Sequence, residues 1–216
     1  TGAKMVDDDF VERVIYTSSH DTLLFFSTEG KIYKLRAFQI PYASRTAKGL
    51  PIVNLLNFDE TEKLAAVLNV NEKEEKEGFF IFATRKGIVK KTEISAFKNI
   101  RTNGIKAILL NEDDELFKVA LTDGEKDIIL GASNGKAIRF SESDIRPMGR
   151  ISAGVRGILV NDPDIVVGMA IVNTDGDEIV IVTDKGYGKR TNVDAFRVQV
   201  RGGKGVKALN LTAKNG

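Results

Sequence analysis

The chain has 216 residues, 42% of them hydrophobic, which is enough to bury a substantial core and indicates a globular protein. Its formal net charge is only +2, so binding to nucleic acid could rest only on where the charges lie. The absence of cysteine excludes disulfides and thiolate metal sites, and no apolar run approaches the roughly 20 residues of a membrane span.

These properties are typical of a cytoplasmic protein, and the first residues do not resemble a signal peptide. The chain starts at Thr1 without an initiator methionine and stops abruptly at Gly216. We therefore expect it to be a piece of a longer protein.

Four short apolar runs recur along the chain and predict strands that are buried on both faces. They are residues 23–26, 79–82, 128–130 and 179–182. A residue followed by glycine comes after each run, which predicts a two-residue hairpin turn. The four turn glycines are Gly30, Gly87, Gly135 and Gly186. Their spacing gives a period of roughly 50 residues, which indicates a repeat architecture.

A short basic strand follows each turn glycine. Its cations are Lys31 and Lys34, Lys90 and Lys91, Lys136 and Arg139, and Lys189 and Arg190. An apolar residue comes next in each repeat, and we expect it to be a core plug between neighbouring units and not a platform for base stacking. These anchors are Phe38, Phe97, Ile145 and Phe196.

A segment that combines arginine, glycine and a further cation closes each repeat, at residues 45–49, 101–106, 150–156 and 198–207. Glycine lets the backbone approach a ligand and present its N–H groups, while Lys and Arg add positive charge. This combination suits a phosphate backbone. An apolar strand is predicted after it, for example at residues 52–56 and 107–110.

The sequence thus predicts one domain over residues 1–216, with repeats at about 10–56, 64–110, 115–160 and 165–211. Four strands in each repeat without a long amphipathic helix favour an all-β, propeller-like architecture, and the lack of tryptophan excludes a WD40 array. Acidic residues gather between the repeats, at 7–9, 59–62, 112–115 and 162–164. Stacked units would therefore form one basic rim and one acidic rim.

With these repeats in place, the chain resembles the C-terminal domain of the DNA gyrase A subunit, which belongs to the bacterial type IIA topoisomerases. The resemblance covers essentially the whole chain and is carried by residues 44–56, 146–150, 154–157 and 186–191. It implies a β-pinwheel, a propeller-like disc whose blades exchange strands. It also implies a non-catalytic domain that wraps double-stranded DNA around a basic outer rim and supports negative supercoiling. The implied assembly is an ATP-dependent heterotetramer of the gyrase A and B subunits on the nucleoid in the cytoplasm.

The signature box of that family reads Gln-Arg-Arg-Gly-Gly-Lys-Gly and belongs to its first blade. Residues 199–205 match it with Val200 in place of one arginine, but in a later repeat, so the first box is expected upstream of this chain. The resemblance carries a phosphate-binding role over to Arg201, Gly202, Gly203 and Lys204. The register of the repeated cations extends the predicted DNA contacts to Lys34, Arg45, Lys48, Lys90, Lys91, Arg101, Lys106, Arg139, Arg150, Arg156, Lys189, Arg190 and Lys207.

Three other interpretations stay open. The first is the C-terminal domain of the topoisomerase IV A subunit, a related disc that usually lacks the box. The second is a propeller-like scaffold for protein interactions. The third, an enzyme with a site at the propeller centre, lacks candidate residues, because His20 is the one histidine and is expected in a turn, and no Walker A spacing occurs. We therefore expect no catalytic residue, metal, cofactor, small-molecule substrate or membrane contact.

Overall fold

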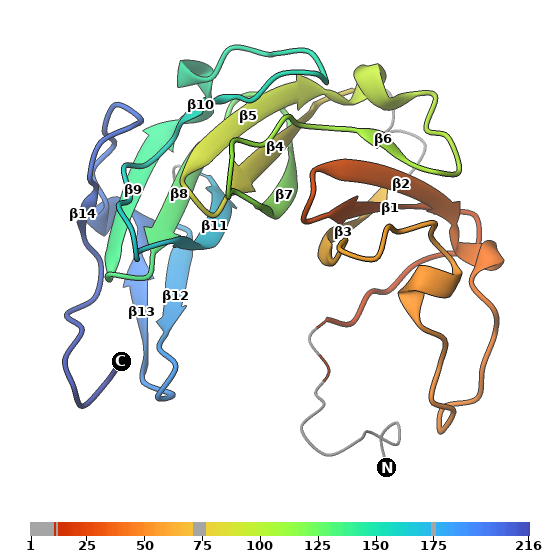
Figure 1. Ribbon diagram of the computed structural model, residues 1–216. Helices are drawn as coiled ribbons and strands as arrows, with labels where there is room; N and C mark the ends of the chain where they lie inside the picture. Colours follow the sequence, from red (N-terminus) through yellow and green to blue (C-terminus); the bar gives the residue numbers. More distant parts are fainter. Residues whose placement is uncertain (1–10, 12, 71–76, 174–175) are drawn as a thin grey trace.

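The computed structural model describes residue 11 and residues 13–70, 77–173 and 176–216, and shows four antiparallel β-sheets arranged side by side as the blades of an arc (Figure 1). The predicted all-β, propeller-like architecture is confirmed. Of the predicted acidic junctions, residues 7–9 lie outside the described part of the chain. No described helical segment has the length and hydropathy that a membrane-spanning helix needs.

Three blades have four strands and one has two. Blade 1 has the order β3-β1-β2-β6, with β1 Thr22–Ser27, β2 Lys31–Arg36, β3 Leu64–Val70 and β6 Ile105–Lys106. Blade 2 has the order β10-β5-β4-β7, with β4 Phe79–Thr84, β5 Ile88–Glu93, β7 Leu116–Thr122 and β10 Val155–Arg156. Blade 3 has the order β11-β8-β9-β14, with β8 Asp127–Ala132, β9 Lys136–Ser141, β11 Val166–Val172 and β14 Val206–Lys207. Blade 4 pairs β12 Glu178–Val182 with β13 Gly188–Asn192.

Short 3₁₀ helices complete the described elements. They are η1 Ala37–Gln39, η2 Ile52–Asn54, η3 Ile94–Phe97, η4 Glu142–Asp144 and η5 Val193–Ala195. Helices η1, η3, η4 and η5 each follow the second strand of a blade and lead into the next basic segment.

The outermost strand of each complete blade comes from the following repeat. Strand β6 follows β5 in the chain but pairs with β2, and in the same way β10 pairs with β5 and β14 pairs with β9. Figure 1 shows these strands on the outer side of the arc, with β3, β7 and β11 on its inner side. We call residues 101–108, 150–158 and 201–209, which carry these strands, the exchange segments. The strand exchange that the resemblance implied is therefore present.

The core lies between the blades. Because side chains alternate along a strand, each central strand contributes to two neighbouring clusters. In β4, Phe80 and Phe82 pack toward blade 1, where Phe26 meets Phe80 edge-to-face at 5.5 Å, while Ile81 packs toward blade 3. The predicted burial on both faces is thus confirmed for the first three apolar runs. It is wrong for the fourth, because Val180 and Val182 are 66% and 65% exposed on the side of β12 that no described blade covers.

Three of the four predicted anchors are buried between blades, since Phe97, Ile145 and Phe196 are at most 4% exposed. The prediction for Phe38 is wrong, because its side chain is 65% exposed. The residue that ends η1, as Ile145 and Phe196 end η4 and η5, is Ile40, and it is 36% exposed because no described blade packs against it.

The apolar strands predicted at residues 52–56 and 107–110 are absent. Residues 52–54 form η2, and residues 107–110 have no regular structure. Pairing ends after β6 because the backbone N–H groups of Ala107 and Ile108 both donate to the carbonyl of Gly30, at 2.8 and 3.2 Å. Ile108 then inserts between blades 1 and 2 and is fully buried.

Gly30, Gly87 and Gly135 occupy the third position of a three-residue loop and not the second position of a two-residue loop. The N–H of Gly87 donates to the carbonyl of Thr84 at 3.1 Å, and Gly87 has φ +84°, as in a type I turn followed by a left-handed residue. A Cβ at Gly87 would lie 2.4 Å from the carbonyl oxygen of Ile158. The glycine is therefore required by the exchange segment packed on it.

Lys90, Lys91 and Arg139, predicted to contact DNA, are buried and we withdraw them from the predicted set. The Lys91 ammonium donates to the carbonyl of Glu142 at 2.8 Å. The Arg139 guanidinium donates to Asp127 at 2.8 Å and to the carbonyl of Val193 at 3.1 Å. Lys91 and Arg139 therefore each reach the 3₁₀ helix of the next blade and join two blades.

Lys90 joins two consecutive exchange segments. Its ammonium is fully buried and donates to the carbonyls of Ala107 at 2.7 Å and Arg150 at 2.6 Å. Burial, with a smaller contribution from the positive charge of Arg150, lowers the pKa of Lys90 to about 8.

We expect Gly87→Ala to cost about 2–5 kcal/mol of stability, because it combines a left-handed backbone with a steric clash. Gly186→Ala is the matched control, since Gly186 has φ +78° but nothing within 4 Å of its Cβ position. That variant should cost only about 1–2 kcal/mol, from the backbone alone. Urea unfolding of both variants measures the difference. Equal losses would show that the exchange segment does not press on Gly87.

The Lys90 pKa also predicts how stability depends on pH. Because this pKa is lower in the folded chain than in the unfolded chain, the unfolded chain binds more protons between about pH 8 and pH 10. The stability of the wild type relative to Lys90→Met should therefore rise with pH across this window, by up to about 3 kcal/mol. Urea titrations at several pH values measure it. If the stability of the wild type relative to Lys90→Met stays constant or falls as the pH rises, the lowered pKa of Lys90 is contradicted.

Candidate nucleic-acid interface

One glycine in each exchange segment lies directly on the second strand of the preceding blade. Gly104, Gly154 and Gly205 have φ values of +69°, +95° and +71°. A Cβ there would lie 2.7 Å from the Tyr33 ring, 2.5 Å from the Val89 carbonyl and 2.5 Å from the Ala137 carbonyl, respectively. The repeated glycine therefore serves strand exchange.

Gly202 and Gly203 also join exchange segments to each other. The N–H of Gly202 donates to the carbonyl of Gly157 at 2.6 Å, and the carbonyl of Gly203 accepts from the N–H of Leu159 at 2.8 Å. The predicted phosphate contact of Gly202 therefore cannot use this N–H, because the N–H is already bound within the protein.

Two of the arginines that open the exchange segments, Arg150 and Arg201, hold the segment before them. Arg150 donates to the carbonyl of Lys106 at 3.3 Å, and Arg201 donates to the carbonyls of Arg156 at 3.1 Å and Asp144 at 3.0 Å. A guanidinium has more N–H groups than these bonds use, so each arginine is fixed in place and can still bind an anion.

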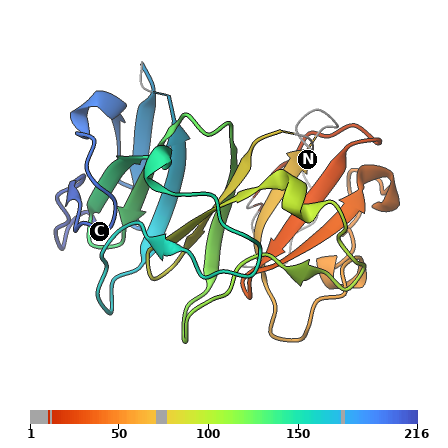
Figure 2. The same ribbon diagram turned by 90° about the horizontal axis from the view of Figure 1, so that it is seen from above.

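The outer side of blades 1 and 2 carries an open groove of about 760 Å³ that we call the basic groove. Five cations line it: Lys34, Lys98, Arg101, Lys106 and Arg150. The other lining residues are Asn99, Ile100, Ile105 and Ile151, so no described lining residue is a carboxylate. Figure 2, which views the arc from above, shows the loops of the exchange segments crossing from blade to blade on this side. The groove therefore offers a surface of one charge sign.

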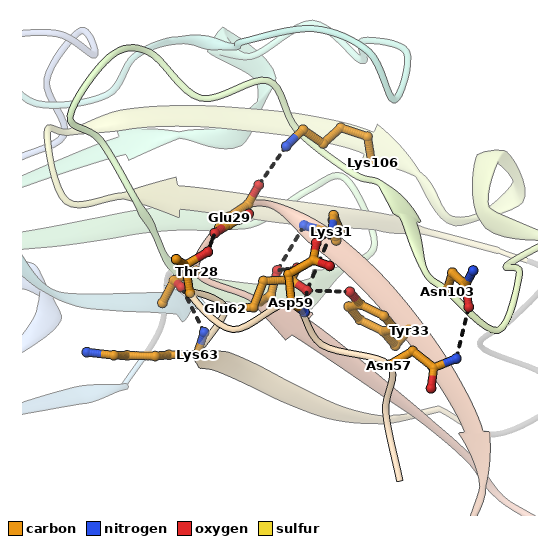
Figure 3. Close-up of polar contacts among 12 residues, drawn as sticks. Thr28, Glu29, Lys31, Tyr33, Asn57, Asp59, Glu62, Lys63, Asn103 and Lys106 are labelled. Atoms are coloured by element: carbon orange, nitrogen blue, oxygen red, sulfur yellow. Dashed lines mark hydrogen bonds and ion pairs between the residues drawn. The ribbon is translucent and has the colours of Figure 1, made fainter. Parts of the chain in front are cut away.

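The groove brings together cations from three repeats. Lys34 comes from β2, Lys98, Arg101 and Lys106 come from the second repeat, and Arg150 comes from the third. The Lys106 ammonium donates to the carbonyl of Glu29 at 2.9 Å, which ties this side chain to the first hairpin (Figure 3). The buried ammonium of Lys90 donates to the carbonyl of Arg150 and so fixes the backbone of this groove residue.

Lys98 was missed by the sequence prediction. It directly follows the anchor Phe97, and Arg146 and Arg197 directly follow the anchors Ile145 and Phe196. All three cations are exposed. A cation immediately after the anchor was therefore the sequence signal that could have identified them.

The remaining predicted cations are placed as follows. All seven are exposed, namely Arg45, Lys48, Arg156, Lys189, Arg190, Lys204 and Lys207. Arg190 pairs with Glu178 at 3.1 Å, and Lys207 donates to Asn210 at 3.3 Å. Lys189 and Arg190 correspond in the repeat to the buried Lys90 and Lys91. Lys189 is exposed because no described exchange segment covers β13, and Arg190 is exposed because no described blade follows blade 4.

A buried polar network supports the groove from the blade 1 side (Figure 3). Glu62 accepts hydrogen bonds from Tyr33 at 2.6 Å and Ser27 at 2.7 Å. Burial opposes ionisation of Glu62, but hydrogen bonds from Tyr33, the Asp59 backbone and Ser27 outweigh it and lower its pKa. The same loop donates from Asn57 to Asn103 of the exchange segment at 2.9 Å. The network thus fixes the loop against which the exchange segment 101–108 lies.

Three carboxylates of this region, Glu29, Asp59 and Glu62, have oxygens within 4.8 Å of one another, as a metal site would require. The Lys31 ammonium lies among them, paired with Asp59 and 3.5 Å from Glu62. Because an ammonium already supplies the positive charge, we assign no metal to this cluster.

Comparison with known proteins agrees with this geometry. The sequence model of the family described as DNA gyrase C-terminal domain, beta-propeller, matches residues 21–71, 79–123, 126–173 and 177–215, about one segment for each blade. The DNA gyrase A subunit of Staphylococcus epidermidis is 43% identical over all 216 residues, and that of Staphylococcus aureus is 42% identical. The chain spans 24% of the length of these relatives.

Solved structures show the same fold. The C-terminal domain of a DNA topoisomerase IV superposes with a TM-score of 0.81 at 31% identity, covering 91% of this chain and 61% of that one. A DNA gyrase A C-terminal domain superposes with a TM-score of 0.74 at 24% identity, covering 95% of this chain and 68% of that one. With the family match spread over all four blades, the chain belongs to the DNA gyrase C-terminal domain family.

Proposed function

We propose that this chain binds double-stranded DNA along the outer side of its arc and bends it, without reading its sequence. The observation that carries the proposal is the basic groove, in which five cations from three repeats meet without a carboxylate among the described lining residues. Membership of the gyrase family supports it. Lys98, Arg146 and Arg197 are exposed and follow the 3₁₀ helices of blades 2, 3 and 4, so each of these blades adds a positive charge to the surface.

Phosphate contacts fix the position of a duplex but do not distinguish bases, so the binding is expected to be independent of sequence. Bending a site of roughly 20–30 base pairs costs about 1–6 kcal/mol in smooth elastic estimates, which several spread contacts can offset. If about eight cations neutralise phosphates, log K falls with log salt at a slope of roughly −7.

For the longer protein, we propose that this domain serves the A subunit of an ATP-dependent type II topoisomerase, which works together with the B subunit. There it would support negative supercoiling of the bacterial chromosome in the cytoplasm. The proposal rests on the relatives named as the A subunit of DNA gyrase, of which this chain matches 24%. The catalytic residues are assigned to other parts of that protein, and none is proposed for this domain.

The A subunit of topoisomerase IV is the alternative assignment. It is supported by the superposition with a topoisomerase IV C-terminal domain, whose TM-score of 0.81 is higher than the 0.74 of the gyrase domain. Gyrase is favoured by the higher identity of the gyrase relatives and by the match of residues 199–205 to the gyrase box. A protein-interaction scaffold would use the same blades but would not bind DNA in a salt-sensitive way.

Reversing one charge in the groove should weaken binding. We expect Arg101→Glu to reduce affinity for a duplex roughly tenfold at low salt and to lower the salt slope by about 1 or 2, because one phosphate contact is replaced by repulsion. Lys63→Glu is the matched control, since Lys63 is exposed but lies outside the groove. Fluorescence anisotropy at several salt concentrations measures both variants. Equal losses of affinity in the two variants would show that binding depends only on the net charge of the chain and not on the groove.

Bending is tested by energy transfer between the ends of a labelled duplex of about 40 base pairs. We expect the ends to approach at low salt and to separate as salt is added. Binding without approach of the ends would retain the DNA interface and remove bending from the proposal. An absence of binding even at low salt would overturn the DNA proposal and favour the scaffold.

A further inference from the structure

Ile151 is an apolar residue of the basic groove that packs against no core cluster. It is 69% exposed. Ile100 and Ile105 line the same groove, but both pack against the cluster between blades 1 and 2. Ile151 belongs to none of the clusters formed by the described residues. The exchange segments before and after it, residues 101–108 and 201–209, are both described, so its neighbours on the outer side of the arc are in place.

One exposed isoleucine is ordinary on a protein surface, but the loop that carries Ile151 is held on both sides. The carbonyl of Arg150 accepts from the buried ammonium of Lys90 at 2.6 Å. The carbonyl of Ser152 accepts from the N–H of Leu109 at 3.0 Å. The backbone on either side of Ile151 is therefore fixed, and a ligand that covers this side chain needs to order little else.

Charge and apolar surface occur side by side in all three exchange segments. A β-branched apolar residue is the direct neighbour of the arginine in each of them, in the pairs Ile100-Arg101, Arg150-Ile151 and Val200-Arg201. The guanidinium of Arg150 donates to the carbonyl of Lys106 and has further N–H groups for an anion. A ligand of the groove is therefore expected to present an anionic group next to an apolar one.

The backbone of a nucleic acid has this alternation, because a sugar with carbon-bound hydrogens lies between neighbouring phosphates. The five cations of the basic groove, with no described carboxylate in its lining, favour such a polyanion. The sugar next to Ile151 would lose water on binding. A ribose would then bury its 2′-hydroxyl against an apolar side chain without a hydrogen-bond partner, which is unfavourable. A deoxyribose has no such group.

We infer that Ile151 contacts a deoxyribose of the bound duplex and thereby makes the basic groove prefer DNA to RNA. The inference rests on the proposed DNA binding. An apolar contact contributes by removing surface from water and releases no counterion, whereas each cation that binds a phosphate does. The cations therefore set how steeply affinity falls with salt, and Ile151 adds affinity that persists as salt is raised.

A salt titration measures the two contributions separately. We expect Ile151→Ala to lower affinity for a DNA duplex roughly five- to tenfold at every salt concentration and to leave the salt slope unchanged. Ile151→Met, which restores an apolar side chain of similar size, should recover most of the loss. Ile165→Ala is the matched control, because Ile165 is 38% exposed but lies outside the groove. Fluorescence anisotropy measures all three variants.

An RNA duplex of the same base sequence tests the contact with the sugar. The wild type should bind DNA more tightly than this RNA. In Ile151→Ala the preference should shrink by about the factor that is lost on DNA, because the substitution removes a contact that RNA does not make. Competition between the two duplexes for each variant, followed by anisotropy, gives the ratio of affinities.

Failure of this inference can be distinguished from failure of the proposed DNA binding. If the wild type binds DNA with a steep salt dependence but Ile151→Ala binds as tightly as Ile165→Ala, the inference is overturned and the DNA interface stays. An equal loss on DNA and RNA would also overturn it, because the contact would then not depend on the 2′ position. A wild type that binds no duplex even at low salt would overturn both proposals.

Discussion

The pairing of each exchange segment with the preceding blade is the interaction on which the rest of the structure depends. Without it, β2, β5 and β9 would each expose a row of unpaired backbone groups, and the clusters between the blades would lose Ile108 and Ile158. Because each segment satisfies only the neighbouring blade, stability is built from contacts between adjacent repeats. The outer side of the arc is therefore formed by the same residues that hold the blades together.

Strand exchange also divides the repeated cations into two groups. Lys91 and Arg139, on the second strands of blades 2 and 3, point into the junction with the next blade and bind backbone carbonyls there. Those directly after the anchors, such as Lys98, stay exposed on the outer side. A cation that joins two blades is thus expected to recur once per repeat, just as a cation that contacts DNA is. The two kinds of cation are distinguished by whether the side chain is buried or exposed.

Local sequence patterns predicted the two central strands of each blade, the positions of the turns and the buried faces of the first three blades, because burial and turn chemistry act over a few residues. His20 lies in a turn, as expected. The partner of each strand could not be predicted in this way, since β3 pairs with β1 across the boundary between two predicted repeats. The glycine pattern was assigned to phosphate, whereas Gly154 is required by its contact with the Val89 carbonyl. Phe38 was chosen by hydrophobicity, although Ile40 holds the repeated position.

The basic groove exists only where three repeats are joined, because Lys34, Arg101 and Arg150 belong to different repeats. A ligand that binds all three must favour the joined state over any state in which an exchange segment has left its blade. Under the proposed function, DNA binding and strand exchange are therefore thermodynamically linked, and the linkage is reciprocal. Lys90 lies at the centre of this linkage, since its ammonium bonds the exchange segments 101–108 and 150–158 without contacting solvent. A buried structural cation thus positions the exposed cations that would meet the phosphates.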